Sequence, residues 1–120
     1  MSPKEQIVSE YYNRIDANDV DWIIGQFSEN AVYKRAEITY SGITEIDDFF
    51  RNQRKINGVH VIETITSTTT QVFAVGHFKG VGEKGAQKSI GFVDVWDFDT
   101  NDKVVLRRSY LAIGHQHILK

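Results

Sequence analysis

The sequence predicts an α+β fold in which three amino-terminal helices pack on a strongly curved antiparallel β-sheet. Three observations support this prediction. Apolar residues early in the chain recur at three- and four-residue spacing, which is the period of an amphipathic helix. From Val59 onward the period changes to two, and short turns separate the runs, as expected for antiparallel strands. Gly76 and Gly91 interrupt these runs and indicate bulges or curvature.

The first two helices are predicted from their starting residues. Ser2-Pro3-Lys4-Glu5 offers an N-cap hydroxyl, a proline at the first helical position and a glutamate that completes a capping box. The apolar stripe that follows breaks at Asp16-Ala17-Asn18-Asp19. Asn18 or Asp19 is then expected to cap a short second helix that reaches Phe27.

The third helix is expected after Ser41-Gly42, with Thr44 and Asp47 as a second capping box, and it should end at Asn57-Gly58. Strands are expected near residues 31–35, 38–40, 59–69, 71–81, 87–98 and 104–115.

Composition narrows the function classes. The chain has 120 residues, so we expect a single domain that spans 1–120. Its net charge is −2 with scattered Lys and Arg, which argues against nucleic acid as a partner. Cysteine is absent, which excludes disulfides, thiolate nucleophiles and cysteine-based zinc sites. We find no apolar signal core, no run of membrane-spanning length and no glycine-rich nucleotide motif. These features predict a soluble cytoplasmic protein with no cofactor and no membrane contact.

Asp94 is the most informative residue. If residues 89–98 are extended, Asp94 shares one face with Ile90, Phe92, Trp96 and Phe98. An ionised carboxylate among large apolar side chains is costly. Asp94 must therefore find a partner, stay protonated or line a cavity open to a ligand.

The opposite face of this strand predicts an interface. Val93 and Val95, with neighbours such as Val105, form a face too apolar to stay in contact with water. A homodimer through that face is therefore expected.

Four segments carry a resemblance to a known superfamily. They are residues 11–21 (YYNRIDANDVD), 27–33 (FSENAVY), 41–50 (SGITEIDDFF) and 92–98 (FVDVWDF). In order and composition they resemble the nuclear-transport-factor-2-like superfamily, whose members include ketosteroid isomerases and SnoaL-type polyketide cyclases. The resemblance spans nearly the whole chain and implies a cone-shaped fold. It does not fix the chemistry, because the superfamily contains both enzymes and binding modules.

The isomerase pattern is only partly met. The resemblance implies that Tyr11 and a protonated Asp94 would donate hydrogen bonds to a substrate oxyanion. The general base of the isomerases, however, falls on Arg35, and a guanidinium cannot take a proton from carbon at neutral pH. Steroid isomerisation by that mechanism is therefore not expected. The limonene-epoxide-hydrolase variant has an arginine two residues before its strand aspartate, where this chain has Phe92.

Several functions remain open for Asp94. Its partner is expected to be Arg35 or Arg107. An ionised Asp94 could act as a general base, whereas a neutral Asp94 could only donate a hydrogen bond. Alternatively, Arg35 binds an anionic substrate group while Asp94 orients it. A purely structural ion pair that closes an unused cavity is the third possibility.

The histidines offer further candidates. His60 is predicted to share a strand face with Ile62, Thr64 and Thr66, and it could act as an acid or base at a pocket rim. His115 and His117 share one strand face, but no third ligand is evident, so no metal site is predicted.

Aromatic residues gather in the elements that should line the cavity. They are Tyr11, Tyr33, Phe50, Phe92 and Trp96. Such a lining suits a mostly apolar, carbonyl or enol-like ligand. Two functions follow. The first is a small cofactor-free isomerase, cyclase or dehydratase with Asp94, Tyr11 and His60 as catalytic residues and Arg35 and Arg107 among the binding residues. The second is a non-catalytic ligand-binding or dimerisation module.

Overall fold

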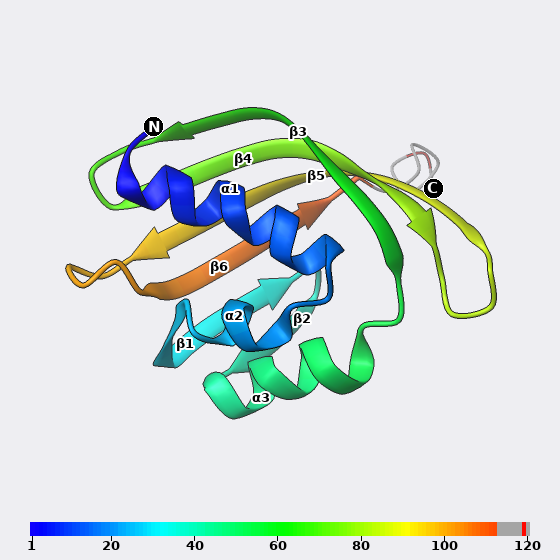
Figure 1. The fold of residues 1–120 in the computed structure, drawn as a ribbon, viewed down its shortest axis with the longest axis horizontal. Coiled ribbons are helices and arrows are strands. Elements are labelled where there is room, and N and C mark those ends of the chain that lie inside the picture. Colours follow the sequence, from blue (N-terminus) through cyan, green and yellow to red (C-terminus); the bar gives the residue numbers. More distant parts are fainter. Residues whose placement is uncertain (113–118, 120) are drawn as a thin grey trace.

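A single six-stranded sheet, with helices packed against it, forms the body of the molecule in the computed structural model, which describes residues 1–112 and Leu119 (Figure 1). The helices are α1 (Pro3–Asp16), α2 (Val20–Ile24) and α3 (Ile43–Asp48), and a π-helical turn, Phe49–Gln53, follows α3. The strands are β1 (Phe27–Arg35), β2 (Ile38–Ser41), β3 (Asn57–Ser67), β4 (Gln71–Val81), β5 (Gln87–Phe98) and β6 (Val104–Leu111). The predicted α+β class is confirmed.

The sheet has the strand order β2-β1-β6-β5-β4-β3. All neighbours are antiparallel except β1 and β6, which run parallel. The predicted antiparallel pairing of the four strands from β3 to β6 is confirmed, whereas the parallel pairing of β1 with β6 departs from the antiparallel sheet expected. The β1–β2 hairpin comes from the start of the chain and joins the sheet along its last described strand. No local pattern encodes a pairing between such distant segments.

The first two helices begin where the sequence predicts. The Ser2 Oγ accepts a hydrogen bond from the Glu5 backbone N–H, and the Ser2 N–H donates to the Glu5 carboxylate, which completes the capping box. Asp19 caps α2 by accepting from the backbone N–H of Trp22. The buried stripe of α1 consists of Val8, Tyr11, Tyr12 and Ile15.

The third helix is shorter than predicted, and its capping differs. Gly42 is the N-cap and makes no side-chain capping bond, so the expected box of Thr44 and Asp47 does not form. Instead, the Glu45 carboxylate accepts from the backbone N–H of Ser41. The α-helix ends at Asp48, and the π-helical turn then brings Phe49 and Phe50 into the core. Such π turns are frequent at functional sites.

A β-bulge changes the expected faces of β3. The pairing with β4 skips one residue between Ile62 and Thr64, so Glu63 is the extra residue. Beyond the bulge Ile65 packs against the core, whereas Thr64 and Thr66 are exposed. The prediction that both threonines share the face of His60 is therefore wrong, because a bulge reverses the alternation of side chains.

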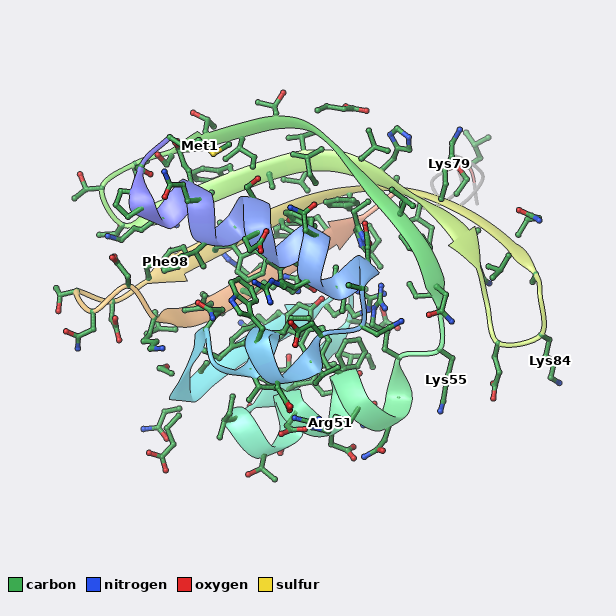
Figure 2. The ribbon with its side chains drawn as sticks, in the orientation of Figure 1. Met1, Arg51, Lys55, Lys79, Lys84 and Phe98 are labelled. Atoms are coloured by element: carbon green, nitrogen blue, oxygen red, sulfur yellow. The ribbon has the colours of Figure 1, made fainter. Side chains whose placement is uncertain are left out.

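The core lies between the helices and the inner face of the sheet. The helix α1 packs against β3 and β4, while α3 packs against β1 and β2. Side chains fill the space between the ribbons (Figure 2). None of the described helices is long and apolar enough to cross a membrane. On the outer face Val93 is half-buried, and Val95 is already buried within this single chain.

Candidate active site

Asp94 lies at the centre of a buried hydrogen-bond network. The alternation of β5 turns its side chain inward, where only 2% of the residue is exposed. Its carboxylate accepts three hydrogen bonds: from the Tyr12 hydroxyl at 2.5 Å, from the Ser109 hydroxyl at 2.5 Å and from Arg107 Nη2 at 3.0 Å. Ser109 is its direct neighbour in β6. The predicted arginine partner of Asp94 is therefore Arg107.

Arg107 links Asp94 to the first helix. Its Nη1 donates to the Tyr11 hydroxyl at 2.6 Å, and its Cζ lies 4.3–4.6 Å from the ring centroids of Trp96, Tyr11 and Tyr33. Cation–π contacts of this kind favour a desolvated guanidinium. Burial acts to lower the pKa of Arg107, but the Asp94 carboxylate and nearby tyrosines outweigh it and raise that pKa well above its ordinary value. Arg107 is therefore a permanent cation.

Tyr11 keeps one hydrogen-bonding function free. Its oxygen accepts from Arg107, and no described residue accepts its proton. Burial raises the pKa of Tyr11, and the Arg107 charge only partly opposes this effect. The hydroxyl therefore stays protonated at neutral pH and can donate to a ligand.

Arg35 is connected to Asp94 only indirectly. Its Nη1 donates to the Tyr33 hydroxyl at 3.3 Å, and Tyr33 is 3.1 Å from the Ser109 hydroxyl, which in turn donates to Asp94. Because Arg107 occupies the ion-pairing position, Arg35 is left available for other partners.

His60 lies on the wall of the same cavity and is paired with Asp16, which stands behind it. The His60 Nδ1 is 2.6 Å from one carboxylate oxygen of Asp16, and the backbone N–H of His60 donates to the other oxygen at 3.0 Å. The His60 side chain is 11% exposed. Burial lowers the pKa of His60 below its usual 6.5, and Asp16 opposes this shift only in part. The imidazole is therefore neutral at pH 7. With Nδ1–H directed at the carboxylate, Nε2 carries the lone pair and has no partner among the described residues.

These groups line one small cavity. Its polar wall comes from Tyr11, Tyr33, Arg35, Arg54, His60, Asp94, Arg107 and Ser109, and its apolar wall from Phe50, Ile56, Phe78, Ile90, Phe92 and Leu111. The side chains leave about 30 Å³ of free volume. A water molecule needs roughly 10–15 Å³ of such volume, so there is room for about two or three waters, and any larger ligand would have to displace side chains.

Comparison with known proteins identifies the family. The model of the SnoaL-like domain matches residues 8–107. The chain belongs to the SnoaL-like domain family. No curated protein matches the sequence significantly.

Several solved structures share the fold of this SnoaL-like protein. An NTF2-like protein of unknown function from Burkholderia pseudomallei superimposes with a TM-score of 0.84 and 18% identity, covering 93% of this chain and 92% of that one. An LEH-like epoxide hydrolase from M. tuberculosis gives 0.79 and 15%, covering 91% and 82%. An epoxide hydrolase/cyclase-like enzyme with a role in pyran ring formation in the polyether salinomycin gives 0.80 and 18%, covering 92% and 91%. At these identities the likeness shows the NTF2-like fold.

The structure brings most of the predicted site residues of this SnoaL-like protein together. Trp96 is the exception, because it does not line the cavity. It lies in the core, where its ring packs on Arg107 and its Nε1 donates to the Tyr12 hydroxyl. His77 lies away from the cavity, with its Nδ1 3.3 Å from Glu63.

The sequence predicts no metal site, although two of its histidines share a predicted strand face. His115 and His117 lie outside the described residues. Within the described part of the chain no group of three potential ligands gathers.

Four residues of the site were not singled out from the sequence: Tyr12, Asp16, Arg54 and Ser109. One signal was available for Asp16. It sits in the last turn of α1, where a carboxylate opposes the helix dipole, and such a placement suggests another partner. The other three residues follow ordinary helix, turn and strand patterns.

Proposed function

We propose that this SnoaL-like protein is a small cofactor-free enzyme that performs acid–base chemistry of the isomerase, cyclase or dehydratase type on a small carbonyl compound. The observation that carries the proposal is that His60, paired with Asp16, lines the same cavity as the Tyr11 hydroxyl. A base and an oxyanion donor are the two groups that enolisation requires.

The proposed reaction begins with proton transfer to His60. The Nε2 lone pair takes a proton from the carbon next to the substrate carbonyl. The electrons of the broken C–H bond form the enolate, whose negative charge moves to the oxygen. Asp16 stabilises the imidazolium that results, because it holds Nδ1–H at 2.6 Å. Return of the proton to a different carbon completes an isomerisation. Its transfer instead to a hydroxyl on the β-carbon, which leaves as water while the enolate electrons form the C=C bond, completes a dehydration.

Tyr11 is proposed to donate to the enolate oxygen. Arg107 donates to the same hydroxyl oxygen at 2.6 Å, which polarises the O–H bond and makes it a stronger donor. Asp94 then acts through Arg107. Because its carboxylate already accepts three hydrogen bonds, one of them from a guanidinium, we assign it the positioning of Arg107 and Tyr11 rather than proton abstraction.

Hydrogen–deuterium exchange at carbon tests this proposal. Small ketones and keto acids are incubated with the protein in D₂O, and loss of the proton signal is followed by NMR. His60→Asn should lower the exchange rate by about 10²–10⁴-fold, the usual contribution of a general base. His77→Asn is the matched control, since His77 lies outside the cavity and should leave the rate unchanged. Equal rates for His60→Asn and the parent protein would remove His60 from the mechanism.

A non-catalytic binding module is the second candidate. Two observations favour it: the free volume is only about 30 Å³, and Asp94 is already engaged by Arg107. Exchange no faster than buffer for every compound tested, together with measurable binding of at least one of them, would support the module and reject the enzyme.

A further inference from the structure

Two arginines of the cavity have no acidic partner among the described residues. Arg35 comes from the end of β1, and Arg54 follows the π-helical turn; both are half-buried and line the cavity. Among the residues that the structure describes, Arg35 donates only to the Tyr33 hydroxyl, and Arg54 only to the backbone carbonyl of Ile56 at 3.2 Å. Within the described part of the chain, neither forms an ion pair. Most of their N–H groups are therefore free to bind a ligand.

Other arginines show that pairing is the rule elsewhere. Arg14 contacts two carboxylates, those of Glu10 and Asp19, and Arg51 also contacts two. Both of these arginines lie at the surface. The two unpaired arginines are instead in the cavity, where water screens charge least.

The lining of the cavity carries a surplus of positive charge. Counting the described residues, it contains three guanidiniums, those of Arg35, Arg54 and Arg107, and one carboxylate, that of Asp94, which leaves a balance of +2. The chain as a whole has a net charge of −2. Burial lowers the pKa of Arg54, and repulsion from Arg35 and Arg107 adds to that effect. An anion bound in the cavity would offset both the burial of the Arg54 charge and its repulsion from the other two guanidiniums.

We infer that Arg35 and Arg54 bind the carboxylate of a small keto acid, so that its carbonyl end lies among Tyr11 and His60. A planar guanidinium matches a carboxylate with two parallel hydrogen bonds, which an ammonium cannot do. The apolar part of the wall includes Phe78 and Ile90, which are available to a short carbon chain. The inference names the substrate class of the proposed reaction and rests on that proposal for its chemistry, although not for binding.

Calorimetric titration with matched ligands tests the assignment. The probes are 2-oxobutyrate, its uncharged methyl ester and inorganic phosphate. The acid should bind more tightly than the ester, and Arg35→Met and Arg54→Met should each weaken the acid by about 10- to 100-fold while leaving the ester unchanged. Because acid and ester are compared within each variant, a small change in folding cancels. Thermal unfolding confirms that each variant is folded.

Arg51→Met is the matched control. It removes the same charge three positions from Arg54, but Arg51 lies at the exposed surface of the turn after α3, paired with Asp21 and Asp47 (Figure 2). It should leave the affinity for the acid unchanged. Equal binding of acid and ester by the parent protein, or an equal loss in Arg51→Met, would overturn the carboxylate site. Tighter binding of inorganic phosphate than of the keto acid would overturn the ligand class.

Two further outcomes separate this inference from the proposed function. Binding of 2-oxobutyrate that depends on Arg54, with no exchange at carbon, would support the carboxylate site and reject the enzyme. Exchange of uncharged ketones that depends on His60, with no preference for acids, would support the enzyme and reject the carboxylate site.

Discussion

Replacing Asp94 by asparagine should destabilise the protein strongly. Asparagine has nearly the same shape, but it removes the counter-charge of Arg107, which is only 4% exposed. It also replaces one acceptor oxygen by an N–H₂ group, while Tyr12, Ser109 and Arg107 all point donors at this side chain. Breaking a buried ion pair by removing one partner costs about 3–5 kcal/mol. A typical domain has a free energy of unfolding of roughly 5–15 kcal/mol, so the loss is a large share of it.

Urea unfolding followed by circular dichroism measures this effect. The change in the free energy of unfolding is taken from the midpoint, with the slope checked for constancy. Asp97→Asn is the matched control. Asp97 is on the same strand, its side chain is 29% exposed and its distance to Arg108 is 3.5 Å, so its loss should cost no more than about 1 kcal/mol.

A double substitution separates charge from packing. In Asp94→Leu/Arg107→Met both charges are removed, and replacing a buried ion pair by apolar side chains is often neutral. The double variant should therefore be more stable than Asp94→Asn. A free energy of unfolding for Asp94→Asn within about 1 kcal/mol of the parent value would refute this expectation, because neutralising a buried and hydrogen-bonded carboxylate should cost more than that.

Three further outcomes are expected. The exchange rate should fall as the pH drops through the pKa of His60, which burial holds below 6.5. Because Asp16 raises that pKa, Asp16→Asn should move the fall in rate to lower pH. A shift of the rate profile to higher pH would contradict this. Gly76→Ala should cost about 1–3 kcal/mol in the same urea assay, because its Cβ would come within 2.3 Å of the Val61 carbonyl oxygen, and unchanged stability would count against the close approach. The outer sheet face should form a homodimer that Val93→Lys dissociates, as judged by light scattering, and a monomeric parent protein at micromolar concentration would end this proposal.

Local pattern predicted much of the fold. The strands β4 and β5 occupy residues 71–81 and 87–98, the ranges expected from the two-residue period, and the capping box at Ser2 forms. These features depend on neighbours in sequence. The parallel pairing of β1 with β6 and the bulge at Glu63 depend on contacts between distant segments, and periodicity does not report such contacts.

In the candidate site, too, local features could be predicted and contacts between distant segments could not. The inward direction of Asp94 and its aromatic neighbours follows from alternation along one strand. Predicting Arg107 and not Arg35 as the partner of Asp94 would have required the relative positions of β1, β5 and β6, which a local pattern does not give. The contact of His60 with Asp16 joins residues 44 positions apart and could not be predicted from either segment alone.

The structure gives the two acidic residues different surroundings, and this difference argues for different functions. Asp94 accepts three hydrogen bonds, one of them from the Arg107 guanidinium, so its oxygens are engaged in holding the buried network together. Asp16 reaches the cavity only through His60, whose lowered pKa keeps an accepting lone pair at neutral pH. A proton taken at Nε2 leaves the Asp94 network intact, and Arg107 and Tyr11 stay in position while charge develops on the substrate. Stability thus depends mainly on Asp94 and proton transfer on the pair of His60 and Asp16, which is why Asp94→Asn should lower the free energy of unfolding more than His60→Asn does.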